Sequence, residues 1–193
     1  MTYIYLLYIN YYIEDKMKTV GKILLQIILL PITILLLPVR LIMSRIIKNK
    51  TSQILNSMTV QNVDTMSGED FEMLVCVLFD NMGFKAERTQ ASRDYGADVI
   101  AKKGGKTYVI QTKLYYNRTV GNACINEVYT ALDYYHGDVA IAMTNAYFSK
   151  PAKNVANELH VALIDRDALI KLIGCPRVHR YKLFLSLISA SQG

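Results

Sequence analysis

The chain has 193 residues, with 22 Lys and Arg against 16 Asp and Glu, which gives a net charge of +6. This length suffices for one domain plus an appendage, and the basic excess suits a nucleic-acid or anionic-membrane partner. The three cysteines lie far apart, without the spacing of zinc ligands or of a CxxC motif. The pattern argues against a cysteine metal site and predicts free thiols in a reducing compartment.

The first third of the chain is apolar. Residues Ile23 to Val39 include only two polar side chains, and residues 41–43 extend the segment to about the 20 residues that a membrane span needs. Basic residues follow it without a small-residue cleavage site, so a membrane anchor is predicted in preference to a signal peptide or a buried core helix. More basic residues follow the segment than precede it, which places the rest of the chain in the cytoplasm. Residues 1–13 are also apolar, which leaves open whether there are one or two membrane segments.

We therefore expect a membrane-anchoring hydrophobic region at residues 1–43, a linker or stalk at 44–65, a domain at 66–174 and a tail at 175–193. The domain opens with a helix, because Ser67 is a good N-cap and apolar residues follow at helical spacing up to Met82. Gly83 ends this helix, and a short strand follows at residues 84–89.

The next element is a hairpin. Gly104 and Gly105 stand between two runs of strand-forming residues, which predicts a two-residue turn. With that turn, Asp98 faces Gln111 at about 4.5–5.5 Å between Cβ atoms. Lys113 lies on the same face as Gln111, because side chains alternate along a strand. One carboxylate, one amide oxygen and one amine therefore converge on one face of the ribbon.

This group of side chains predicts a hydrolytic metal site. A hard cation such as Mg²⁺ prefers oxygen ligands, and a lysine beside it can position a bound water. The alternative is that the polar face of the hairpin simply faces solvent, as in many antiparallel sheets. Both strands are apolar on both faces, however, and charges in a covered sheet are costly unless they are paired or bound to a metal. The flanking residues therefore favour the metal site.

The remaining elements alternate between helices and strands. Their expected order is a helix at residues 123–135, a strand at 138–144, a helix capped by Ser149 that runs to His160, a strand at 161–165 and a helix at 166–173. Taken with the hairpin, this order predicts an α/β fold in which a mixed sheet is covered by helices on both faces.

The element order and several motifs resemble the Mrr-like branch of the PD-(D/E)xK restriction-endonuclease-like superfamily. The family's opening G-x-x-F-E helix is similar to Gly68–Glu72, its D-x-G-x-D motif to Asp94–Asp98 and its Q-x-K motif to Gln111–Lys113. Three further similarities lie at Gly83-Phe84, at Thr144 with Phe148 to Ala152, and at Leu163-Ile164-Asp165. The six occur in the family's order and cover roughly residues 67–173. They imply a restriction-endonuclease-like fold.

The resemblance also implies roles for the site residues of a nuclease that depends on Mg²⁺, with Mn²⁺ as a substitute. Asp98 would be the central metal ligand, with the Gln111 side-chain oxygen and the Thr112 carbonyl as further ligands. Lys113 would orient the attacking water and stabilise charge in the transition state. Glu72 would complete the site directly or through a water. Many relatives carry Glu in place of Gln111, so this site is one negative charge poorer.

Several side chains are candidates for contact with nucleic acid. By the resemblance, Asp94 would support the loop or a second metal. Ser149 and Lys150 begin a helix, where backbone N–H groups favour a phosphate, although an ordinary N-cap is the simpler interpretation. Tyr115 and Arg118 closely follow the Q-x-K motif and would contact the DNA backbone or a base, or pack within their loop.

The motifs together predict a membrane-anchored, Mg²⁺-dependent DNA endonuclease of the restriction or defence type. The alternative is a catalytically inactive nuclease fold that holds DNA or another partner at the membrane. Cutting both strands of DNA would favour a homodimer.

Overall fold

The computed structural model describes residues 17, 20–22, 24, 36–46, 49–89, 95–116 and 118–191. It divides into two compact units, Met1–Ile47 and Lys48–Gly193.

The first unit corrects the prediction of a transmembrane helix. Its longest continuous described helix spans residues 36–46 and contains Arg40 and Arg45. Within the described ranges, no helix has both the length and the apolar character to cross a membrane. The predicted transmembrane helix and the membrane localisation derived from it are therefore wrong. Residues 1–16, 18–19, 23 and 25–35 of that prediction lie outside the described residues.

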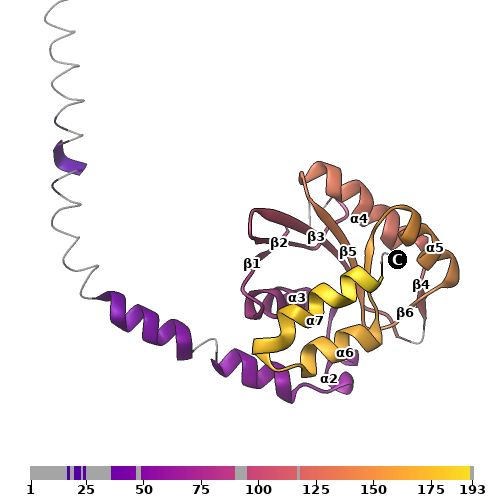
Figure 1. The fold of residues 1–193 in the computed structure, drawn as a ribbon, viewed down its shortest axis with the longest axis horizontal. Coiled ribbons are helices and arrows are strands. Elements are labelled where there is room, and N and C mark those ends of the chain that lie inside the picture. Colours follow the sequence, from indigo (N-terminus) through magenta and orange to yellow (C-terminus); the bar gives the residue numbers. More distant parts are fainter. Residues whose placement is uncertain are drawn as a thin grey trace, which may run out of the picture. The chain divides into compact units, whose positions relative to one another are not determined.

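The second unit is built around a five-stranded mixed sheet of order β1-β2-β3-β5-β7 (Figure 1). Its strands are β1 (Lys85–Arg88), β2 (Val99–Lys103), β3 (Lys106–Lys113), β5 (Val139–Thr144) and β7 (Ala162–Ile164). The first three pair in antiparallel fashion, whereas β3, β5 and β7 are parallel. A small parallel sheet joins β4 (Thr119–Val120) to β6 (Tyr147–Phe148).

The β2–β3 hairpin has the predicted register, with Val99 opposite Ile110. Gly104 and Gly105 form its turn with φ angles of 58° and 78°. This left-handed conformation is available to glycine at little cost, which explains why the pair defines both the turn and the pairing of the strands.

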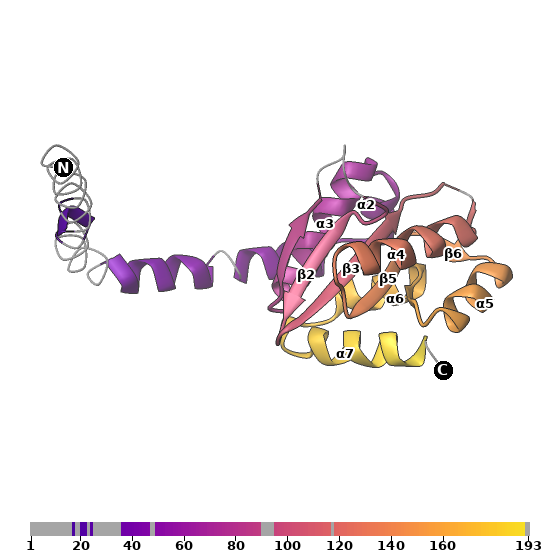
Figure 2. The same ribbon diagram turned by 90° about the horizontal axis from the view of Figure 1, so that it is seen from above.

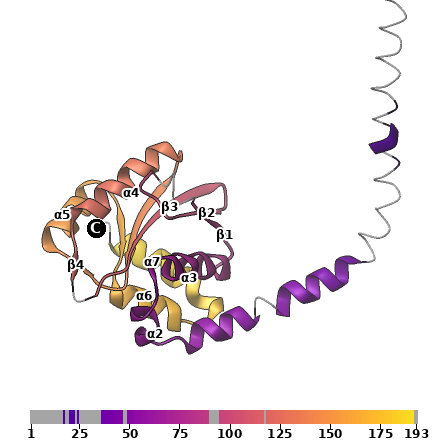
Figure 3. The same cartoon turned by 180° about the vertical axis from the view of Figure 1, so that it is seen from behind.

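Helices cover both faces of the sheet, as predicted. The helices on one face are α2 (Val60–Asp64), α3 (Gly68–Asn81), α6 (Arg166–Gly174) and α7 (Arg177–Ala190), and those on the other are α4 (Asn122–Tyr134) and α5 (Lys150–Glu158). Figure 2 shows α4 in front of β3 and β5, and Figure 3 shows α3, α6 and α7 grouped together from behind.

Each face of the sheet has its own apolar core. Phe79 of α3 and Phe184 of α7 meet edge to face in the first core, with 5.2 Å between ring centroids. Leu55 and Val63 also belong to this core, so residues upstream of position 66 contribute to it. The predicted tail at 175–193 contributes through α7, which is part of the packed unit.

Candidate active site

The predicted catalytic residues line one open cavity of about 510 Å³ at the end of β3. Its lining residues are Met66, Ser67, Gly68, Glu72, Asp98, Gln111, Thr112, Lys113, Leu114, Tyr115 and Tyr116. Side chains from α3, from the start of β2 and from the end of β3 are thereby brought together, although they lie far apart in the sequence.

Asp98 is half-buried and directly precedes β2. Its Oδ2 accepts hydrogen bonds from the N–H of Thr112 at 2.7 Å and from the Thr112 hydroxyl at 2.8 Å. The N–H of Asp98 donates to the carbonyl of Ile110 at 2.9 Å. The strand pairing therefore shifts by one residue at this end of the hairpin. As a result, the carboxylate of Asp98 reaches Thr112 and does not lie directly opposite Gln111, where a regular register would place it.

The loop that presents Asp98 lies directly against α4. Gly96 has a φ of 87°, and a Cβ at this position would lie 2.6 Å from the carbonyl oxygen of Glu127. Only glycine allows both the left-handed conformation and this close backbone approach. Gly96 of the D-x-G-x-D motif thus sets the distance between the Asp98 loop and α4.

Gln111 is 5% exposed and lines the cavity. Its Nε2 lies 3.5 Å from the carbonyl oxygen of Thr112. Its Oε1 is buried and accepts no hydrogen bond from any residue that the structure describes. A buried carbonyl oxygen without a donor is costly, so this atom is a strong candidate for contact with a cation or water.

Lys113 is paired with a carboxylate on the helix that covers this face of the sheet. Its Nζ lies 2.8 Å from Oε2 of Glu127 in α4. Burial acts to lower the pKa of the Lys113 amine, but the ion pair with the Glu127 carboxylate outweighs burial, and the pKa is raised above its ordinary value. Glu127 therefore keeps the amine protonated and fixes its position.

Glu72 projects from the first turns of α3 and is held by Arg88 at the end of β1. Its Oε2 accepts hydrogen bonds from Nε of Arg88 at 3.0 Å and from Nη2 at 2.7 Å. The start of α3 is fixed by a capping box in which the Ser67 hydroxyl accepts from the N–H of Asp70 at 3.1 Å. These contacts determine how the Glu72 carboxylate meets the cavity.

Across the described ranges, no group of three or more acidic, histidine or cysteine side chains could hold a metal ion. The residue types that line the active-site cavity explain why it has no such group. It contains the carboxylates of Asp98 and Glu72, but the third oxygen donor comes from the amide of Gln111.

The candidates for nucleic-acid contact occupy different places. Tyr115 and Arg118 line a second cavity of about 470 Å³, and Tyr115 also lines the first. Ser149 caps α5, because its hydroxyl accepts from the N–H of Ala152 at 3.3 Å, and Lys150 beside it is exposed. The predicted role of Asp94 lies outside the described residues.

Two residues of the site, Glu127 and Arg88, were not found by sequence analysis. Glu127 had a detectable signal: it follows the buried Cys124 by three residues and precedes the buried Val128, so it lies beside the buried stripe of its helix. Arg88 ends a four-residue strand that alternates between exposed and half-buried positions, a pattern typical of an ordinary edge strand.

A family model described as a restriction endonuclease, Mrr_cat, matches residues 63–173. The curated proteins give no match. Among solved structures, the DNA modification-dependent restriction endonuclease AspBHI is 17% identical with a TM-score of 0.49, over 74% of this chain and 40% of that chain. The MspJI restriction endonuclease, solved in complex with a 27-mer oligonucleotide, is 18% identical with a TM-score of 0.45. The match covers 75% of this chain and 35% of that chain. A protein of unknown function, AF1548, is 19% identical with a TM-score of 0.45, over 52% of this chain and 63% of that chain. The chain thus spans less than two thirds of the length of each of these three.

Proposed function

Because the chain belongs to the Mrr_cat family of restriction endonucleases, we propose that it is a DNA endonuclease that hydrolyses phosphodiester bonds with the help of a divalent metal ion. The observation that carries this proposal is the single cavity in which Glu72, Asp98, Gln111 and Lys113 meet. Each of these residue types suits metal-assisted phosphodiester hydrolysis, and they come from separate elements of the fold.

The oxygen donors of the cavity fit a hard divalent cation. The buried Oε1 of Gln111 has no hydrogen-bond partner among the described residues, and the carboxylate of Asp98 lies in the same cavity. Together with the carbonyl of Thr112, they form a set that suits Mg²⁺, with Mn²⁺ as a substitute. When bound, such an ion polarises the phosphate and makes a bound water more acidic.

Lys113 supplies a positive charge at a fixed place. Glu127 holds its amine at 2.8 Å and raises its pKa, so the amine is protonated at neutral pH. In this state Lys113 orients the attacking water through a lone pair of the water and stabilises the negative charge that develops on the phosphate. Glu72, positioned by Arg88, brings a second carboxylate to the same reacting centre.

DNA contacts beyond the reacting phosphate are proposed for the neighbouring cavity. Arg118 lies there, and Tyr115 and the exposed Tyr116 line both cavities. Arginine and tyrosine are common partners of the DNA backbone. Ser149 and Lys150 at the start of α5 are a second proposed phosphate contact. A single active site cuts one strand at a time, so double-strand cleavage would use a homodimer.

A catalytically inactive module that binds DNA or another partner is the second candidate. The observation in its favour is that two charged side chains of the site are already paired within the chain, Lys113 with Glu127 and Glu72 with Arg88. Calorimetry separates the two candidates, because an inactive module would bind neither Mg²⁺ nor Mn²⁺, even with DNA present.

The direct test is cleavage of supercoiled plasmid by the full chain, with Mg²⁺ or with EDTA. We expect cleavage only with the metal, and loss of at least about a hundredfold in rate for Asp98→Asn and for Lys113→Met. Asp133→Asn, on the exposed surface of α4, is the matched control and should cut normally. Cleavage by Asp98→Asn at the normal rate would overturn the proposal.

A further inference from the structure

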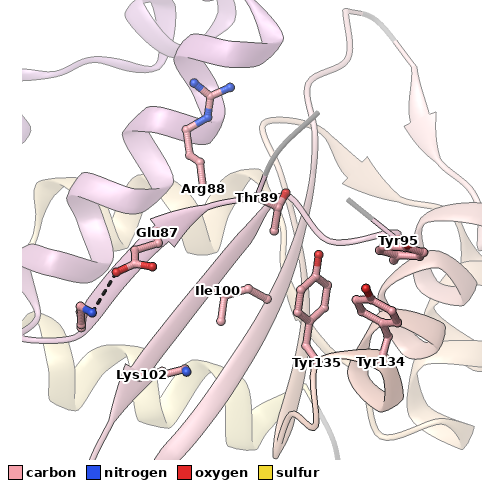
Figure 4. Close-up of a pocket in the computed structure, with 9 residues that line it drawn as sticks. Glu87, Arg88, Thr89, Tyr95, Ile100, Lys102, Tyr134 and Tyr135 are labelled. Carbon is pink, nitrogen blue, oxygen red and sulfur yellow. Dashed lines mark ion pairs between the residues drawn. The ribbon is translucent and has the colours of Figure 1, made fainter. Parts of the chain in front are cut away.

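A separate cavity lies over the outer strands of the sheet (Figure 4). Its volume is about 410 Å³, and its lining residues are Lys85, Glu87, Arg88, Thr89, Tyr95, Ile100, Lys102, Tyr134 and Tyr135. Sites for small molecules usually measure about 300–1,000 Å³, so a ligand the size of one nucleotide fits here. Three tyrosines and three basic residues make up most of this lining.

Three tyrosines form the wall of this cavity. The rings of Tyr95 and Tyr134 are stacked, with 3.9 Å between centroids and 23° between planes. Tyr135 meets Tyr134 edge to face at 4.9 Å. Figure 4 shows Tyr135 standing between Ile100 and Tyr134, with Tyr95 beside Tyr134. Tyr95 is 50% exposed and Tyr134 is 53% exposed, so these aromatic surfaces are open to a ligand.

Tyr95 has a costly backbone conformation at this wall. Its φ angle is 42°, in the left-handed region that residues with a Cβ rarely adopt. Strained backbone of this kind occurs preferentially at functional sites. Gly96, which follows it and lies against α4, carries the chain close enough to that helix for Tyr95 to stack on Tyr134.

The charges of the cavity favour an anion. Lys85 of β1 lies directly opposite Lys102 of β2, and like charges in facing positions destabilise a sheet. Glu87, which pairs with Lys85 at 3.0 Å, is the one carboxylate among the residues that line this cavity. Two facing lysines beside exposed aromatic rings match a ligand that has both a phosphate and a flat ring, namely a nucleotide.

The cavity is directly connected to the backbone of the active site. Thr89 lines the cavity, and its N–H donates to the carbonyl of Asp98 at 3.0 Å. Its hydroxyl donates to the carbonyl of Ala97 at 2.6 Å. Through Thr89, the wall of this cavity is hydrogen-bonded to the segment that carries Asp98 into the active site.

We propose that this cavity binds an unstacked base of the DNA strand, with the base against the Tyr95–Tyr134 pair and its phosphate near Lys85 and Lys102. The inference rests on the proposed nuclease function and adds a substrate preference to it. A base inside a duplex has no free face, so the cavity favours DNA with a single-stranded or locally opened segment next to the cleavage site.

The test measures DNA binding by the full chain with Asp98→Asn, which prevents cleavage during the measurement. Two DNAs with the same end-attached fluorescein are compared by fluorescence anisotropy: a blunt duplex, and the same duplex with a single-stranded tail. Tyr134→Ala should weaken binding of the tailed DNA about tenfold and leave the blunt duplex unchanged. Tyr134→Phe keeps the ring and should bind normally. Tyr129→Ala removes another exposed tyrosine of α4, outside the cavity, and should have no effect.

Equal loss of affinity for both DNAs, or no loss for the tailed DNA, would overturn the inference. Displacement of the tail by a free deoxynucleoside monophosphate at comparable affinity would also overturn it, because the ligand would then be a free nucleotide. The proposed function is tested apart from this, by plasmid cleavage with the unmodified chain. If the unmodified chain cleaves plasmid but tail binding does not depend on Tyr134, only the base site is disproved. If tail binding depends on Tyr134 but plasmid is not cleaved, only the nuclease activity is disproved.

Discussion

One carboxylate oxygen of Asp98 accepts two hydrogen bonds from Thr112, from its N–H at 2.7 Å and from its hydroxyl at 2.8 Å. Two donors on one oxygen hold the carboxylate in a single orientation relative to β3. Thr112 is therefore a positioning residue for Asp98, in addition to the ligand role proposed for its carbonyl. The middle residue of the Q-x-K motif thus connects the two strands that form the site.

Thr112→Val tests this role, because valine has nearly the same shape as threonine and lacks the hydroxyl. The N–H bond remains, so Asp98 should keep its place but lose orientation, and the cleavage rate should fall about tenfold. Thr107→Val in the same strand is the control and should leave the rate unchanged. The measurement is the single-turnover cleavage rate at saturating metal. A normal rate for Thr112→Val would show that the hydroxyl does not position the carboxylate.

Glu127→Gln tests the control of Lys113 by α4. Burial lowers the pKa of Lys113, whereas Glu127 and Cys124 of α4 and Asp98, just before β2, raise it. Without the Glu127 charge, the effect of burial is less strongly opposed, and the pKa of Lys113 falls. The protonated amine is the active form, so the alkaline limb of the pH–rate profile should move to lower pH.

The profile of Asp133→Asn, which removes an exposed carboxylate from the same helix, should match the unmodified chain. A Glu127→Gln enzyme that is slower at every pH, with an unmoved alkaline limb, would mean that Glu127 acts only on structure. The Lys113→Met variant provides the second reference, because the limb assigned to the lysine should be absent from its profile.

The hairpin and its register could be predicted because their causes are local. Gly104 and Gly105 adopt the left-handed conformations that a two-residue turn needs, and the turn alone fixes which residues face each other. The start of α3 could also be predicted, from Ser67 and the acidic residues after it. The family resemblance, which rested on motifs placed on these elements, is confirmed by the match at residues 63–173.

What could not be predicted depends on how distant elements pack. The Lys113–Glu127 pair exists because α4 lies over β3, and no spacing in the sequence encodes that contact. The one-residue shift at Asp98 arises where the paired part of the hairpin ends. A prediction that assumes a regular register therefore misplaces the Asp98 carboxylate slightly. The transmembrane helix was inferred from the apolar content and the length of residues 23–43, but no described helix is long and apolar enough to cross a membrane.

Arg180 of α7 is the clearest structural residue outside the site, and it is 0% exposed. Its guanidinium donates to the carbonyls of Leu172 at 2.7 Å, Ile173 at 3.0 Å and Cys175 at 2.6 Å, where α6 ends. It also donates to the side-chain oxygens of Asn56, at 2.7 Å, and of Asn81. One buried side chain thereby joins α3, α6 and α7 to the helical segment around residue 56.

Arg180→Met should destabilise the fold by about 3–5 kcal/mol, because the buried acceptors that it satisfies would lose their donor. Methionine replaces much of the buried volume, so the loss reports on the hydrogen bonds more than on a cavity. Lys182→Met, an exposed position of the same helix, should change stability by no more than about 0.5 kcal/mol. Urea unfolding of the full chain measures both. Equal stability of the two variants would mean that the carbonyls at the end of α6 find other donors, and that α7 is held by its apolar face alone.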